Sequence, residues 1–485
     1  MFFSSSSSSK SASSLNQDGR LELTPKQRRL ILIGISLASF MTPFGMSMLN
    51  LSLPEIGLDF HAGAHALGWV STAYLFSSVL FLIPMARLSD LYGRKKVFSL
   101  GMVIAVCTAC LGPFSPSFWF LVLLRIFDGF AMACVFATSL PILSSIYPPT
   151  ERGSAFGINV ALVYLGSSMG PVIGGLMTAH LGWRSLFFLL IPLALFSLLI
   201  VRRILKTDFI ESAGEPFDKK GAVLYMISIL FLLFGLSNLP ETWAFILLAI
   251  GLIMFPLFVL YSRKQTYPIV QIHLFFTNKR FARSNFATFL NYAGTYAIIF
   301  FLSLYLQRVL LHSADTAGFL LLAQPALQAI FSPFVGRLAD KVDSRYLTAL
   351  GMIAAAFGLL GLSALHSDST MLYLIGCQML IGFGLAFFAA PNTSSIMNSV
   401  GKKDYSTAGA SLSIMRQSGM VLSMAIAMCA ITIFLGSTEM IQAETVPLFL
   451  TAMKATFCIG AICCFAGAIL SYFRGPENIE ESADF

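Results

Sequence analysis

The stretch LILIGISLASFMTPFGMSMLNLSL, residues 30–53, contains no charged side chain. A helix rises about 1.5 Å per residue, so this stretch is long enough to cross the roughly 30 Å hydrocarbon core of a bilayer. Thirteen further apolar stretches of similar length follow it along the chain. The fourteen predicted spans are residues 30–53, 66–86, 97–114, 118–142, 154–177, 186–201, 221–239, 242–261, 284–306, 317–335, 347–365, 371–391, 408–435 and 448–473. The sequence therefore predicts an all-α integral membrane protein.

The composition excludes a soluble protein of this size. Of the 485 residues, 56% are hydrophobic and only 11% are charged. Soluble domains carry about 25% charged residues, so a soluble fold could not cover its surface with so few polar groups. The shortage is expected where lipid is the outer solvent.

The basic residues follow the predicted spans. The two tails and the even-numbered loops together hold 26 of the 31 Lys and Arg residues. Basic residues are enriched in the cytoplasmic loops of membrane proteins, so this distribution predicts that both termini are cytoplasmic. The net charge of +8 thus marks topology, and we expect no nucleic-acid partner.

Two short motifs recur in the second part of the chain. RLSD, residues 87–90, follows the second predicted span, and RLAD, residues 337–340, follows the tenth. DGF, residues 128–130, and IGF, residues 381–383, occupy similar places in spans four and twelve. Repeated halves are typical of alternating-access transporters. We predict a disordered Ser-rich tail (1–29), a six-helix bundle (30–205), a two-helix insert with its leading loop (206–262), a second, pseudo-symmetric six-helix bundle with its leading loop (263–473), and a tail (474–485).

The first repeated motif resembles a signature of the major facilitator superfamily. LSDLYGRKK, residues 88–96, is similar to the loop between helices two and three in that family. The resemblance implies that Asp90, Gly93 and Arg94, with Gly336 and Asp340 in the second copy, form a latch between the halves. The alternative is a basic loop that only anchors the chain at the membrane surface.

The fifth span carries a second signature. GSSMGPVIGG, residues 166–175, resembles the GxxxGPxxGG pattern of exporters in this superfamily. The residues that match are Gly166, Gly170, Pro171, Gly174 and Gly175. Glycines one turn apart let a neighbouring helix approach closely, and Pro171 removes a backbone donor. With fourteen spans, the chain resembles the fourteen-helix drug:proton antiporter family.

Two ionisable residues lie inside the fourth span. Arg125 and Asp128 are three residues apart, so they share one helix face. Charged groups inside a membrane are costly and usually functional. Arg125 matches a family arginine linked to proton coupling, whereas Gly45 stands where the family has an acid. Asp128 is either a proton-titrating carboxylate or a static partner that neutralises Arg125.

Polar and aromatic side chains in both halves are candidates for a central cavity. They are Trp69, Tyr74, Asn159, Asn285, Asn291, Tyr292, Gln324, Gln328, Gln378, Asn392 and Arg416. For any one of them the alternative is a satisfied hydrogen bond between helices. Arg416 could bind a substrate anion or extend toward the cytoplasmic interface, and we favour the interface.

These observations favour a secondary transporter in the plasma membrane that exports lipophilic or amphipathic molecules, driven by the proton gradient. The alternative is a specific exporter or importer of a neutral or zwitterionic metabolite. We expect no cofactor and no metal, because there is no P-loop motif and the cysteines and histidines are dispersed. The expected partners are a small-molecule substrate and the lipid bilayer, and we expect the protein to act as a monomer. An enzyme or a membrane sensor is poorly supported.

Overall fold

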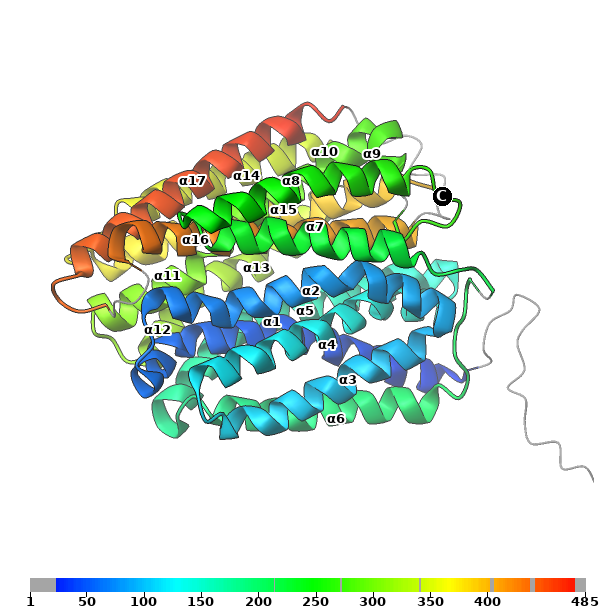
Figure 1. The fold of residues 1–485 in the computed structure, drawn as a ribbon, viewed down its shortest axis with the longest axis horizontal. Helices are drawn as coiled ribbons and strands as arrows, with labels where there is room; N and C mark the ends of the chain where they lie inside the picture. The colour runs from blue at the N-terminus through cyan, green and yellow to red at the C-terminus, as the bar shows by residue number, and fades with distance from the viewer. Residues whose placement is uncertain are drawn as a thin grey trace, which may run out of the picture.

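The computed structural model describes residues 23–475, apart from 213, 271–272, 340–341, 402–404 and 437–440. Fourteen helical stretches in this part are long and apolar enough to cross a membrane, as predicted. Figure 1 shows that both described chain ends lie at the same end of the bundle, which we call the terminal end. The opposite end, which holds the α1–α2 and α5–α6 turns, is called the far end.

The first half of the molecule contains six spans. They are α1 (Pro25–Phe60), α2 (Ala64–Tyr92), α3 (Arg94–Leu111) with the short η1 (Gly112–Phe114), α4 (Phe118–Ile146), α5 (Pro149–Leu181) and α6 (Ser185–Ile204). The first helix begins at Pro25 rather than at residue 30, because Thr24 and Gln27 form a capping box that starts it earlier.

Two inserted helices and the second half follow. The insert consists of α7 (Lys219–Ser237) and α8 (Thr242–Ser262). The second half, led by the short α9 (His273–Thr277), contains α10 (Lys279–Thr295), α11 (Ile298–Leu304), η2 (Tyr305–Val309), α12 (Ala314–Leu321), α13 (Ala323–Ala339), α14 (Ser344–Ser363), α15 (Met371–Asn398), α16 (Tyr405–Leu435) and α17 (Val446–Tyr472). The ninth span is α10 to η2, and the tenth is α12 with α13.

The two halves repeat the same packing. In the first half α1 packs against α5 and α6, α2 against α4, and α3 against α4 and α6. In the second half α10 packs against α16 and α17, α13 against α15, and α14 against α15 and α17. The halves meet where α2 contacts α16, where α5 contacts α12, and where α1 contacts α11. This pairing confirms the two pseudo-symmetric six-helix bundles.

Individual contacts repeat as well. The Phe81 and Phe130 rings lie 4.9 Å apart between centroids in the first half, and Phe331 and Phe383 lie 5.6 Å apart in the second. Phe331 and Phe383 occupy the positions in the second half that correspond to Phe81 and Phe130 in the first. The glycines that precede Phe130 and Phe383 each touch a backbone oxygen of the neighbouring helix.

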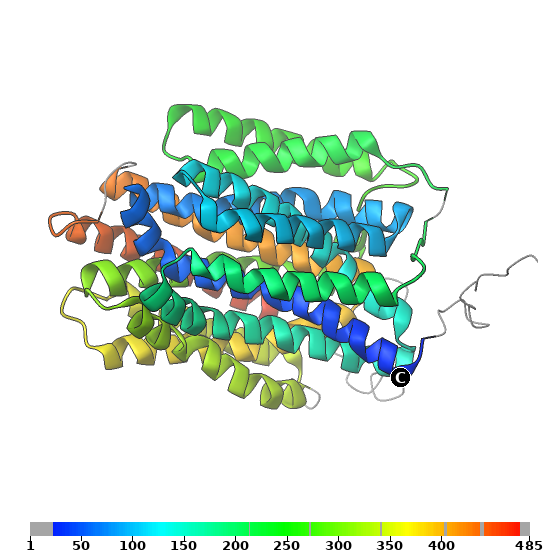
Figure 2. The same ribbon diagram turned by 90° about the horizontal axis from the view of Figure 1, so that it is seen from below.

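The insert packs beside the contact between α2 and α16, one of the places where the halves meet. Helix α7 contacts both α2 and α16, and α8 packs on α7. The Tyr225 hydroxyl on α7 donates a hydrogen bond to the carbonyl of Val79 on α2, at 2.8 Å. Figure 2 shows the two insert helices at the edge of the molecule, outside both bundles.

The ninth span is broken, which hydropathy did not predict. The α-helix stops after Thr295 and restarts at Ile298. The backbone N–H of Ala297 donates instead to the hydroxyl of Ser423 on α16, at 3.1 Å. A broken helix is tolerated in a membrane where neighbouring side chains satisfy the freed backbone groups.

Candidate functional site

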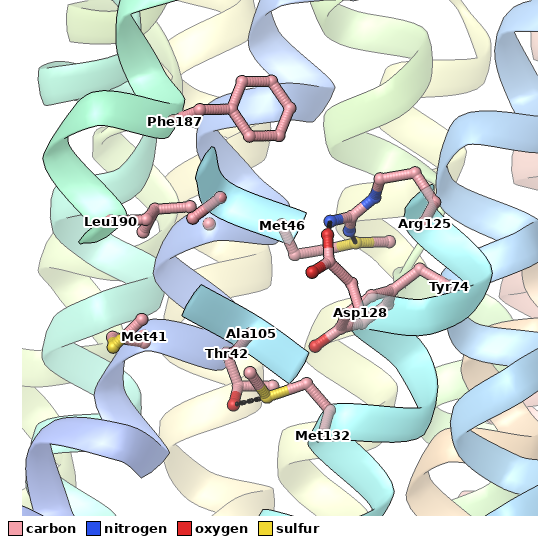
Figure 3. A pocket seen from close by; sticks show the side chains of 12 residues that line it. Met41, Thr42, Met46, Tyr74, Ala105, Arg125, Asp128, Met132, Phe187 and Leu190 are labelled. Atoms are coloured by element: carbon pink, nitrogen blue, oxygen red, sulfur yellow. Dashed lines mark hydrogen bonds and ion pairs between the residues drawn. The ribbon is translucent and has the colours of Figure 1, made fainter. Parts of the chain in front are cut away.

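The fourth span holds a buried ion pair. A guanidinium nitrogen of Arg125 lies 2.6 Å from Asp128 Oδ2, and both side chains point to the same side of α4 (Figure 3). The second carboxylate oxygen of Asp128 accepts a hydrogen bond from Thr108 on α3. The Arg125 side chain is 4% exposed and that of Asp128 is 16% exposed, so the pair lies within the first half. The spacing predicted this pair, whereas the role of Thr108 was not expected.

Arg125 makes three further contacts that hold its orientation. Its guanidinium carbon lies 4.4 Å from the ring centroid of Tyr74, an arrangement that favours a cation over the ring face. Its Nε donates to the carbonyl of Val70 at 3.4 Å, and Nη2 approaches the sulfur of Met46 at 3.4 Å. Tyr74, a predicted cavity residue, therefore belongs to this site.

A small cavity adjoins the ion pair. It encloses about 30 Å³ between α1, α2, α3, α4 and α6, with Arg125, Asp128 and Tyr74 among the residues that line it (Figure 3). This is room for one or two water molecules. Gly45 also lines the cavity, and a Cβ at Gly45 would meet only the two methyl groups of Leu190, at 3.4 and 3.7 Å. A carboxylate, a cation and space for water are the parts that a proton-transfer site needs.

The predicted latch residues of the first half lie together at the terminal end. Arg94 contacts Asp90 at 3.0 Å and also pairs with Glu211, which lies in the loop between α6 and α7. It further donates to Ser145 on α4, at 2.9 Å. Arg87 pairs with Glu215 of the same loop at 2.6 Å. The latch thus binds the loop that leads into the insert.

Asp208 in this loop caps α3. Its carboxylate accepts hydrogen bonds from the backbone N–H groups of Lys95 and Lys96, at 2.8 and 3.1 Å. Gly93 has a φ of +117°, and any side chain there would overlap the Asp208 carboxylate. Sequence reasoning missed Asp208, Glu211 and Glu215, although acids in a loop opposite a basic motif are the signal that could have found them.

The second copy of the latch is only partly described. Asp340 lies outside the described residues. A side chain at Gly336 would meet nothing within 4 Å, so no close contact requires glycine there. The latch role of these two residues, and of Asp90, Gly93 and Arg94, stays a prediction.

The glycines of α5 act as contact points. A side chain at Gly166, Gly170 or Gly174 would meet α1, and one at Gly175 would meet the carbonyl of Ala314 on α12. The first three glycines thus pack α5 within its own half. Gly175 lies where α5 packs against α12 of the other half. A side chain at Gly318 on α12 would likewise meet the carbonyl oxygen of Pro171 on α5.

Several predicted cavity residues make hydrogen bonds, three to a neighbouring helix and one, from Asn285, within its own helix. Asn159 donates to Ser39 on α1 at 3.0 Å, and Asn392 donates to Thr288 at 2.8 Å. Gln378 donates to the Leu320 carbonyl at 3.2 Å, and Asn285 to that of Phe281 at 3.0 Å. Asn291 is fully buried, and neither of its amide atoms has a hydrogen-bond partner among the described residues. That these residues line one cavity with Tyr292, Gln324 and Gln328 stays a prediction.

Two of the predicted residues make aromatic contacts that the sequence did not indicate. Trp69 packs against Phe234 of α7, with 5.7 Å between ring centroids, because the insert covers this part of α2. That Arg416 extends toward the cytoplasmic interface stays a prediction. Its guanidinium lies 5.5 Å from the ring centroid of Phe136 on α4, in the opposite half, where the ring face attracts the cation.

Two hydrogen bonds join the halves near the far end, and we call this pair the far-end tie. Pro54 has no N–H, so α1 leaves the carbonyl of Asn50 without its helical partner. The hydroxyl of Ser303 on α11 donates to this carbonyl at 2.9 Å. Gln307 donates to the carbonyl of Leu51 at 2.8 Å. Pro54 thus frees the Asn50 carbonyl for Ser303, and the neighbouring Leu51 carbonyl adds a second hydrogen bond to the other half.

Comparison with known proteins agrees with this architecture. The chain is 28% identical over 448 residues to the riboflavin transporter RibZ of Clostridioides difficile (strain 630), which covers 92% of this chain and 98% of that protein. It is 27% identical to the multidrug resistance protein Stp of Mycobacterium tuberculosis (strain CDC 1551 / Oshkosh), over 84% of this chain and 77% of Stp. It is also 27% identical to multidrug resistance protein 3 of Bacillus subtilis (strain 168), over 82% and 78% of the two chains.

A solved structure has the same fold. It is a bacterial homologue of the human lysosomal transporter Spinster, in an inward-facing and unoccupied conformation, with a TM-score of 0.66 and 14% identity, covering 93% of this chain and 98% of that one. The sequence profile of the Major Facilitator Superfamily matches residues 35–274 and 285–484. The chain therefore belongs to the major facilitator superfamily and is a multi-pass membrane transporter.

Proposed function

We propose that the protein is a secondary active exporter of lipophilic or amphipathic small molecules, coupled to the proton gradient across the plasma membrane. The observation that carries this proposal is the buried Arg125–Asp128 pair beside a cavity large enough for water. The names of two multidrug resistance proteins among the relatives support export of such molecules.

Asp128 is the proposed proton carrier. When Asp128 is ionised, Arg125 compensates its charge inside the bundle. Protonation would neutralise the carboxylate and leave the Arg125 cation without its partner in a low-dielectric site. This would change the free energy of the conformation in which the pair is buried. A conformation that hydrates the cavity would then favour release of the proton. Alternating access converts this difference into transport.

The latch and the far-end tie are the proposed elements that select between conformations. The Arg94, Asp90 and Glu211 cluster lies at the terminal end, which we place in the cytoplasm because of the charge distribution. The Asn50–Ser303 hydrogen bond lies toward the far end. Opening of the far end would break this hydrogen bond, whereas opening of the terminal end leaves it intact.

Transport of a lipophilic fluorescent dye in proteoliposomes tests the proposal. Purified protein should accumulate the dye when a pH gradient is imposed and lose accumulation when a proton ionophore removes the gradient. Asp128→Asn should abolish the gradient-driven component while dye exchange without a gradient persists. Full gradient-driven transport by Asp128→Asn would show that Asp128 does not carry the proton.

A specific metabolite carrier is the second candidate. It is favoured by the riboflavin transporter, since the match covers 98% of that relative. Counterflow of radiolabelled riboflavin, challenged with structurally unrelated dyes, separates the two candidates. Competition by the dyes supports broad export, whereas riboflavin counterflow that the dyes leave unchanged supports the specific carrier.

A further inference from the structure

Arg416 is a cation inside the membrane without an acidic partner. It lies eleven residues into α16 (Tyr405–Leu435), about 17 Å along the helix axis from its first residue. Its side chain is half-buried. Within the described part of the chain it forms no ion pair and no hydrogen bond, and its aromatic contact is the ring of Phe136, 5.5 Å away.

Two buried arginines of the first half, by contrast, are neutralised by acids. Arg125 pairs with Asp128, and Arg94 pairs with Asp90 and Glu211. Removing a guanidinium from water costs free energy that an acid partner normally offsets. At Arg416 the described residues supply no such acid, so an anion from outside the chain is the group that would offset this cost.

The surroundings of Arg416 are apolar. A Cβ at Gly409, two turns away on the same face of α16, would lie 3.6 and 3.7 Å from methyl groups of Leu140 and Met397, so the neighbours on this face are apolar. Ile414 packs against the apolar cluster of Leu82, Ala133 and Ala137. One cation in an apolar wall suits a molecule with a single negative charge and a large apolar part.

We propose that Arg416 and Phe136 form a recognition site for an amphipathic aromatic anion, such as an aromatic carboxylate. The guanidinium binds the carboxylate through paired hydrogen bonds, and the ring of the ligand packs against Phe136. Phe136 belongs to the first half and Arg416 to the second, so the ligand bridges the surfaces that separate during alternating access. This inference rests on the proposed transport of amphipathic molecules and adds the charge that the substrate carries.

A matched set of ligands tests the charge preference. The probes are 1-naphthoate, 1-naphthylmethanol and 1-naphthylmethylammonium, which share a ring and differ in charge. Binding is measured by isothermal titration calorimetry on the full chain in phosphatidylcholine nanodiscs, with empty nanodiscs subtracted. We expect 1-naphthoate to bind about tenfold to a hundredfold more tightly than the alcohol, as a charge-assisted hydrogen-bonded pair predicts, and the ammonium compound to bind weakest.

Variants assign the preference to Arg416. Arg416→Gln should bring naphthoate affinity down to that of the alcohol, and Arg416→Lys should retain part of the preference. Arg263→Gln is the matched control, because Arg263 also lies over a phenylalanine ring, 4.8 Å from the centroid of Phe276, but at the end of α8. That control should leave all three affinities unchanged.

A second variant keeps the test independent of how Arg416→Gln folds. Phe136→Leu should weaken all three ligands to a similar degree and leave the anion preference in place. The proposal is overturned by an undiminished preference in folded Arg416→Gln, by stronger binding of the ammonium compound, or by no naphthoate binding to the unmodified protein. Since no gradient is present, these outcomes are separate from failure of the proposed proton coupling.

Discussion

Helices α4 and α15 hold the same place in the two halves but differ in chemistry. Gly129 and Gly382 touch equivalent backbone oxygens, of Tyr74 and Gln324. Each glycine is followed by a phenylalanine whose ring packs against a second phenylalanine ring, that of Phe81 on α2 or of Phe331 on α13. Yet the ion pair of α4 has no counterpart in α15, where the sequence repeat places Gln378 and Ile381.

This difference separates packing from charge. Close helix contacts recur because both halves must bury the same helix crossings, and a glycine at each crossing permits them. A buried ion pair is costly, so it is retained only where it serves a purpose. We infer that the first half houses the proton site, whereas the second contributes Arg416 to the boundary between the halves.

The largest expected effect tests the shared packing. Gly129→Val and Gly382→Val should each abolish most folded protein, because either side chain would overlap a backbone oxygen that cannot move aside. Fluorescence-detected size-exclusion chromatography after heating measures this. Gly376→Val is the control on α15, since a side chain there meets nothing within 4 Å. A tolerated valine at one of the two crossings but not the other would break the equivalence of the halves.

A smaller effect is expected from moving the acid within the first half. Gly45 and Asp128 line the same cavity, and a side chain at Gly45 has room. Adding Gly45→Asp to Asp128→Asn should therefore restore roughly a tenth or more of gradient-driven dye transport, since a carboxylate would again share the low-dielectric cavity with Arg125. Proteoliposome transport measures the recovery.

The matched control for this rescue has the same shape without the charge. Gly45→Asn in the Asp128→Asn background should restore nothing. Equal transport by the asparagine and aspartate variants would mean that the cavity does not need a carboxylate, and the proton site would have to be sought outside α4.

The sequence predicted those features well that depend on a single local property, such as the length of an apolar stretch or the spacing of two charges. Fourteen long apolar stretches predict fourteen spans, and an i, i+3 spacing predicts the Arg125–Asp128 pair. It did not predict the break after Thr295, because hydropathy is the same for a continuous and a broken helix. The hydroxyl that accepts from Ala297 belongs to Ser423, 126 residues away. Likewise, the sequence did not predict the contact between Trp69 and Phe234, because only the fold shows that α7 packs against α2.

The smallest expected effect concerns the backbone groups in the first span of each half that have no partner within their own helix. In α1 the free group is the Asn50 carbonyl, bound by Ser303, and in the ninth span it is the Ala297 N–H, bound by Ser423. Hydrogen bonds between helices in membranes contribute about 0.6 kcal/mol on average. Ser303→Ala should thus lower the unfolding free energy in detergent by about that amount.

A double-mutant cycle separates this hydrogen bond from general packing. Pro54→Ala gives α1 back the N–H that can bind the Asn50 carbonyl, so Ser303→Ala should become nearly neutral in that background. Pro54→Ala should not change the cost of Ser423→Ala, which acts on the second half. If Ser303→Ala costs the same with and without Pro54, the proline does not create the acceptor that joins the halves. The contribution of Ser303 would then have to be explained by packing between the halves rather than by a backbone carbonyl that Pro54 frees.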